Sequence, residues 1–137
     1  MLEVKADEPR AWPVEEQTSG SYFGTLTDDL GAMIPASILT ALQLTLWVVR
    51  TDGSIASINN RNHQDVLNAN NVTVFDTLQS TTDGKTYNLR WNYQIPDTTL
   101  VEALPFERHL FLFEFRWTQG NGKRQGVLVV RNIAVVT

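Results

Sequence analysis

Histidine is the side chain whose ordinary pKa lies closest to neutrality, so the two histidines of this 137-residue sequence are its first candidates for acid–base or metal chemistry. His63 lies in an asparagine-rich stretch, and His109 stands at the start of a run of aromatic residues. Neither belongs to a His-Glu-x-x-His pair, and neither has paired carboxylates at a suitable spacing. We expect His109, on an apolar face, to be a hydrogen-bonded residue at the edge of the core.

Other motifs of catalysis are also missing from the sequence. The serines do not occur in a Gly-x-Ser-x-Gly turn, and the glycines form neither a P-loop nor a Gly-x-Gly-x-x-Gly motif. Cysteine is absent, which excludes disulfides and thiolate metal sites. The sequence therefore predicts a protein that is not an enzyme and holds no cofactor.

Several aspartates lie mostly at predicted turns, where loops at one end of a β-sandwich could bring their oxygens together around calcium. They are Asp28, Asp29, Asp52, Asp76, Asp83 and Asp97. Tight turns need the same residue type, particularly before glycine. We therefore expect turn formation and no metal site.

Two long predicted strands must position the candidate binding residues. Residues 108–117 alternate between two faces, which predicts a strand lying on a core. Its inward side chains are His109, Phe111, Phe113, Phe115 and Trp117. On its other face, Leu110 and Leu112 stand among charged residues and are candidates for an interface.

Residues 39–50 predict the second long strand, with its core side made of Leu42, Leu44, Leu46 and Val48. Trp47 falls on the polar side and is the best exposed aromatic within the domain. Two roles fit this position: packing under a loop or an arm, or stacking against a sugar ring.

The rest of the chain reads as short strands separated by turns, at residues 22–27, 55–58, 72–77, 87–94 and 124–136. In residues 87–94 we expect the aromatic residues inward and Asn88, Arg90, Asn92 and Gln94 in solvent. Turn signals occur at 51–54, 82–85 and 119–122, and helical turns fit residues 63–67 and 98–102. The pattern predicts an all-β, immunoglobulin-like antiparallel β-sandwich spanning residues 21–137; a small barrel is the alternative.

Residues 1–20 lack this periodicity and predict an extended N-terminal arm. The arm carries one large aromatic, Trp12, followed by Pro13 and Val14, which could enter a pocket on a neighbouring surface. We expect the arm to be held either by its own domain or, the alternative we favour, by another chain.

The last strand is apolar on both faces, with Val129 among the alternating residues and Arg131 as an interruption. Such a strand must be covered twice. The second cover is either the arm or another subunit, and both remain open.

Basic residues indicate the kind of partner. The net charge is -4 and the basic residues are scattered, which argues against nucleic acid. Three are lysines and eight are arginines, a preference typical of protein interfaces and also of a GC-rich genome. The first ten residues contain acids and no apolar run, so we expect neither a signal peptide nor a membrane anchor, and synthesis in a reducing cytoplasm, that of a host cell included.

Several segments together resemble small immunoglobulin-like virion proteins of tailed bacteriophages. In the first half these are residues 29–35 (DLGAMIP), the turn 51–54 (TDGS), 58–61 (INNR) and 64–73 (QDVLNANNVT); in the second half they are 89–91 (LRW), 96–97 (PD), 107–117 (ERHLFLFEFRW) and 129–133 (VVRNI). The resemblance covers residues 22–136.

The resemblance implies a structural part of a phage particle, in the head decoration, neck or tail, that docks on other virion proteins in multiple copies. Trp12, Pro13, Val14, Trp47, Leu110, Leu112, Val129 and Arg131 are the expected interface residues. Modules of this kind also contact host polysaccharide, so a carbohydrate-binding module on the virion surface is the alternative.

Overall fold

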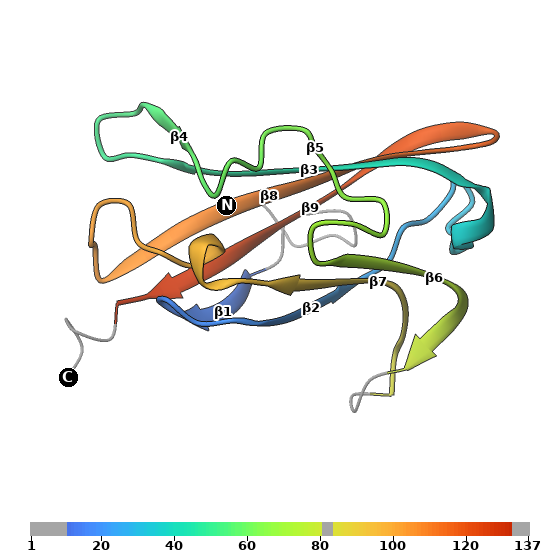
Figure 1. The fold of residues 1–137 in the computed structure, drawn as a ribbon, viewed down its shortest axis with the longest axis horizontal. Helices are drawn as coiled ribbons and strands as arrows, with labels where there is room; N and C mark the ends of the chain where they lie inside the picture. Colours follow the sequence, from blue (N-terminus) through green and yellow to red (C-terminus); the bar gives the residue numbers. More distant parts are fainter. Residues whose placement is uncertain (1–10, 81–83, 133–137) are drawn as a thin grey trace.

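The computed structural model describes residues 11–80 and 84–132, which form two β-sheets stacked on one another (Figure 1). The larger sheet has the strand order β1 (Ala11–Glu15), β9 (Gly120–Arg131), β8 (Phe106–Trp117), β3 (Leu39–Val49) and β4 (Ile55–Ser57), with β5 (Gln64–Asp65) also paired to β3. The smaller sheet consists of β2 (Gly20–Gly24), β7 (Thr86–Tyr93) and β6 (Val72–Ser80). Two short 3-10 helices, η1 (Ala36–Ile38) and η2 (Ile95–Asp97), lie in connections. The all-β sandwich is confirmed.

The inward side chains of β3 and β8 fill the space between the sheets, as the sequence predicts. Leu42, Leu44 and Leu46 of β3 are fully buried, and so are Phe111 and Phe113 of β8. From the other sheet Leu89 and Trp91 of β7 meet them, with the rings of Trp91 and Phe111 5.3 Å apart. At about 2 kcal/mol for each large apolar side chain buried, this layer is the main source of stability.

Glycines of β9 make room for the aromatic side chains of β8. Phe111 pairs with Gly126, and Phe115 pairs with Gly122. A Cβ on Gly126 would lie 2.2 Å from Cζ of Phe111, well inside van der Waals contact. The phenyl rings therefore lie across the strand where β9 has no side chain, which fixes the register of the two strands.

Residues 11–15 are held by their own domain, whereas the sequence favoured another chain as the partner of the N-terminal arm. They form β1, which pairs in parallel with β9 and places Trp12 opposite Leu128 and Val14 opposite Val130. Val14 is buried, and Trp12 packs against the core. The sequence missed this strand because its partner lies more than a hundred residues away, and Pro13 argued against pairing. Residues 1–10 lie outside the described part of the chain.

Three smaller predictions also change. Asn88 is buried, whereas the alternation of β7 had placed it in solvent. Its side chain accepts a hydrogen bond from Leu26 N (2.8 Å) and donates to the carbonyl oxygens of Leu26 (3.0 Å) and Ile34 (2.7 Å). The loop before β3 therefore covers this position. Residues 63–67 contain β5 in place of a helical turn, and the turn expected at 98–102 is replaced by η2.

Asparagines permit the compact path of residues 58–71. Six residues of this stretch have positive φ, a backbone region that asparagine tolerates better than most residues; they are Asn59, Asn60, His63, Asn68, Asn70 and Asn71. The stretch follows β4, contributes β5 to the larger sheet and ends at β6. The asparagine-rich composition thus reflects local backbone geometry.

Candidate functional site

The expected interface residues separate onto two faces of the larger sheet. Trp12 and Val14 point inward: the ring of Trp12 lies 5.1 Å from that of Tyr22, edge to face, and its side chain hydrogen-bonds to Tyr93. The expectation that Trp12 and Val14 meet a neighbouring chain is therefore wrong. Pro13, between them, is exposed on the outer face.

The outer face of the larger sheet collects the remaining expected residues. Trp47 pairs with Leu110, and Leu110 pairs with Val127, so the three stand in one row across β3, β8 and β9. Val129 and Arg131 follow along β9, and Pro13 pairs with Val129. Strand pairing thus brings together Pro13, Trp47, Leu110, Leu112, Val129 and Arg131, which are scattered over the sequence.

Sequence reasoning missed three large apolar side chains on this face. Val49 is 52% exposed, Ile55 68% and Phe106 54%. Val49 pairs with Ile55, and both lie with Phe106 toward the same end of the sheet, beyond the pair of Trp47 and Leu110. The sequence alternation places these side chains on the outward face near strand ends, and this could have indicated their exposure. We call Pro13, Phe106, Leu110 and Val129, together with Val49 and Ile55, the outer apolar surface.

Two depressions also lie on the outer face, along the pairing of β3 with β8. The first, about 430 Å³, is lined by Thr45, Leu46, Trp47, Ile55, Ser57, Asn62, His63 and Leu112. The second, about 480 Å³, is lined by Ala41, Gln43, Glu114, Phe115, Arg116, Asn121, Gly122 and Lys123. His63 Nδ1 of the first lies 2.9 Å from Glu114 Oε1 of the second, so the two depressions meet at this pair.

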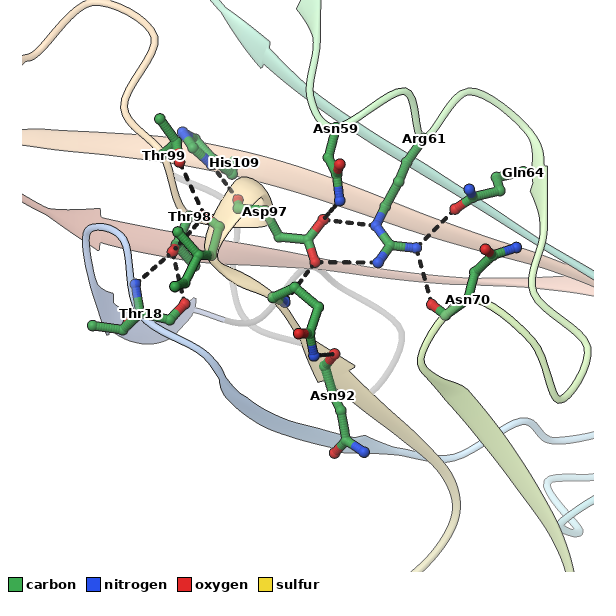
Figure 2. A network of polar contacts seen from close by, with 12 residues as sticks. Thr18, Asn59, Arg61, Gln64, Asn70, Asn92, Asp97, Thr98, Thr99 and His109 are labelled. Atoms are coloured by element: carbon green, nitrogen blue, oxygen red, sulfur yellow. Dashed lines mark hydrogen bonds and ion pairs between the residues drawn. The ribbon is translucent and has the colours of Figure 1, made fainter.

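A buried ion pair joins the asparagine-rich loop to the connection between the sheets (Figure 2). Arg61 Nε lies 2.7 Å from Asp97 Oδ1, and Arg61 Nη2 lies 3.2 Å from Oδ2, with both side chains almost fully buried. Asp97 also accepts from Asn59 Nδ2 and from Gln94 N. The guanidinium lies 5.6 Å from the ring centroid of Trp91.

A second buried pair stands beside the first. His109 Nδ1 lies 3.0 Å from the carbonyl oxygen of Asp97, and Nε2 lies 3.0 Å from Glu107 Oε1. Burial alone raises the pKa of Glu107. Hydrogen bonds from Val101 N, His109 and Glu102 N outweigh that effect and hold the pKa below its ordinary value of 4.5.

These two pairs are structural. The side chains of Asp97 and His109 are fully buried and that of Glu107 is 1% exposed, so the network presents no group to a substrate. Its effect is to hold residues 59–70 and 95–102 in place. The expectation that His109 is a hydrogen-bonded core residue is confirmed.

Asp28 and Asp52 close turns, as expected, whereas Asp76 lies in strand β6 and Asp97 forms the buried ion pair with Arg61. Asp28 accepts from Leu30 N and Ala32 N, and Asp52 accepts from Ser54 N and Oγ. Within residues 11–80 and 84–132, histidine and acidic side chains form no group of three or more that could hold a metal ion. Asp83 lies outside these ranges.

The described helices include none with the length and apolar character needed to cross a membrane. No family model and no curated protein sequence matches this chain.

Proposed function

We propose that this protein is a non-enzymatic structural component of a tailed-bacteriophage virion, which docks on other virion proteins through the outer apolar surface. The observation that carries the proposal is the exposure of Val49, Ile55 and Phe106 on one face, each more than half exposed. Soluble monomers seldom leave large apolar side chains grouped in this way, and such groups mark interaction sites.

Arginines on the same face support a protein partner. Arg108, Arg116 and Arg131 all lie on the outer alternation of β8 and β9, and all three are exposed. Arginine is enriched in protein interfaces because its planar, weakly hydrated guanidinium can pair while partly buried. Arg131 is already oriented by an ion pair with Glu15 of β1.

Strand order supports the immunoglobulin-like part of the proposal. Immunoglobulin domains have one sheet with the order B-E-D and another with G-F-C extended by C′. Taking β2 as B, the two sheets here read β2-β7-β6 and β9-β8-β3-β4, which is that order. His109, near the start of the strand equivalent to F, bonds to an upstream backbone carbonyl as the corner tyrosine does in that fold.

A symmetric particle explains why the outer apolar surface would be covered in the mature protein. We propose that the chain is made in the host cytoplasm and assembles in multiple copies into the head, neck or tail. The outer apolar surface then becomes buried, with the arginines around it contacting the partner. The role needs no nucleic acid, membrane or cofactor.

Virion composition tests this function. Phage lacking the chain would be complemented with wild type, Phe106→Ser or the control Leu30→Ser, which changes a side chain 94% exposed outside the larger sheet. Quantitative mass spectrometry of purified particles should find wild type and Leu30→Ser at one fixed copy number, and Phe106→Ser reduced about tenfold or more. Circular dichroism should show all three folded. Wild-type protein found in infected-cell cytosol and never in particles would overturn the proposal.

A further inference from the structure

Arg108 stands within the outer apolar surface. On the outward alternation of β8 it lies between Phe106 and Leu110, and across the sheet it pairs with Val129 of β9. Arg108 is exposed. Within the part of the chain that the structure describes, its side chain makes no ion pair and no hydrogen bond. The surface therefore carries a free guanidinium among its apolar side chains.

A partner that covers the outer apolar surface must also cover this guanidinium. Water solvates Arg108 in the isolated chain, and taking a charge out of water without a counter-ion is strongly unfavourable. A carboxylate on the partner removes this penalty best, because the planar guanidinium can donate two parallel N–H···O bonds to it. The partner therefore needs an acidic side chain opposite Arg108, next to the apolar groups that cover Val49, Ile55 and Phe106.

The chain's own acidic side chains do not supply this carboxylate when two copies meet through the same surface. Glu15 of β1 and Glu102 at the turn after β3 border the surface. Glu15 forms the ion pair with Arg131, and the Glu102 carboxylate accepts from Thr51 N (2.9 Å) and Oγ1 (3.0 Å). A two-fold contact places the same residues on both sides. It would bury Arg108 opposite carboxylates that already have partners.

A head-to-tail contact between copies lacks a matching surface. Such a contact joins two different surfaces of one chain, and the second would also have to be apolar at its centre. Outside the outer apolar surface, the exposed large apolar side chains of the described residues are Leu30, in one turn, and Ile95 and Val101, in the connection from β7 to β8. Copies with a net charge of -4 also repel one another. These observations favour a different protein as the partner.

We propose that the partner of the outer apolar surface is a different virion protein with a carboxylate among apolar side chains, and that this carboxylate forms a bidentate ion pair with Arg108. This inference rests on the proposed docking in a virion and names the chemistry of the partner. Val49, Ile55 and Phe106 supply the apolar contact. Arg108 selects the partner, because a surface without the carboxylate would leave its charge buried alone.

Binding of added protein to particles measures the effect of the guanidinium. Purified particles from phage lacking the chain would be mixed with full-length variants, and quantitative mass spectrometry would give the bound copies per particle at each concentration. Arg108→Met should weaken binding about thirtyfold or more, although methionine makes the surface more apolar. Arg116→Met, on the same face but paired with Asn121, should weaken it less than about threefold, and Leu30→Ser should bind as wild type does.

The outcomes separate this inference from the docking function. Arg108→Met that binds as tightly as wild type, or more tightly, would overturn the carboxylate partner and leave docking in place. Wild type that does not bind the particles at all would overturn the docking function and this inference with it. Circular dichroism should show every variant folded, since the substituted side chains are exposed.

Cross-linking identifies the carboxylate. Arg108→Lys keeps the charge and supplies an amine, which a water-soluble carbodiimide joins to a contacting carboxylate as an amide, the carbodiimide taking up the water that is lost. On particles, tandem mass spectrometry should find residue 108 linked to an aspartate or glutamate of another virion protein, and Arg108→Met should give no such product. A link to a second copy of this chain, or no link at a saturating protein concentration, would overturn the inference.

Discussion

The Nδ1 atom of His109 lies 3.0 Å from the backbone carbonyl oxygen of Asp97, and this contact ties the start of β8 to the connection that follows β7. A carbonyl oxygen only accepts, so Nδ1 carries the hydrogen. Nε2, on the other side of the ring, faces Glu107 Oε1 at 3.0 Å. With Glu107 ionised, its Oε1 is a charged acceptor that faces Nε2, so the buried imidazole ring links Glu107 to the connection after β7.

Glu107→Gln should therefore lower stability in a pH-dependent way. The pKa of Glu107 is lower in the folded state than its ordinary value of 4.5, so its stabilisation is present above that value and is lost as the pH falls through the folded-state pKa. We expect the variant to be less stable by about 2 to 4 kcal/mol near neutral pH, with the difference narrowing below about pH 4. Urea unfolding at a series of pH values measures the loss of stability and its dependence on pH.

The control for that experiment is Glu15→Gln, which changes an exposed carboxylate paired with Arg131. Its effect should stay below about 1 kcal/mol at neutral pH. A loss of stability in Glu107→Gln that is equally large at pH 7 and at acid pH would contradict a role for the ionised Glu107 carboxylate.

Arg61 and Asp97 should be strongly coupled. Asp97→Asn leaves the Arg61 guanidinium buried without its counter-ion, and Arg61→Met leaves the Asp97 carboxylate buried without its counter-ion. Each variant should lower the free energy of unfolding by about 3 to 5 kcal/mol. The double variant should cost less than the sum by about 2 to 3 kcal/mol. The same double-mutant cycle on the exposed pair of Arg131 and Glu15 should give less than about 1 kcal/mol. Additive effects at Arg61 and Asp97 would rule out the coupling.

Trp12 and Pro13 are neighbours on opposite faces of β1, so their variants should affect different properties. Trp12→Ala removes packing against Tyr22 and the bond to Tyr93, and should lower the free energy of unfolding by about 2 to 4 kcal/mol. Pro13→Ala, on the exposed face, should change it by less than about 1 kcal/mol. Thermal and urea unfolding of the isolated protein measure both. A Trp12→Ala variant as stable as wild type would mean that β1 adds little to the domain.

The sequence by itself determined the elements whose pattern is local. Alternation over ten or more residues indicated the inward faces of β3 and β8, because a buried face needs an apolar side chain at every second position. The turn at 51–54 followed from Asp52 and Gly53, since Gly53 has a φ of 88° that glycine adopts without strain. The outward position of Trp47, Leu110 and Leu112 came from the same alternation.

Only the tertiary structure decided what covers each face. The alternation of β7 places Asn88 on the solvent side, yet the loop carrying Leu26 and Ile34 closes over it. The backbone of Leu26 and Ile34 makes three hydrogen bonds with the Asn88 side chain. Trp12 lies in a segment without periodicity, and its pairing partner Leu128 and hydrogen-bond partner Tyr93 are far along the chain. The pairs of Arg61 with Asp97 and of His109 with Glu107 likewise depend on how two connections meet each other and the start of β8. Such contacts join residues that local patterns cannot relate, because the free energy that forms them comes from burial after the sheets have packed.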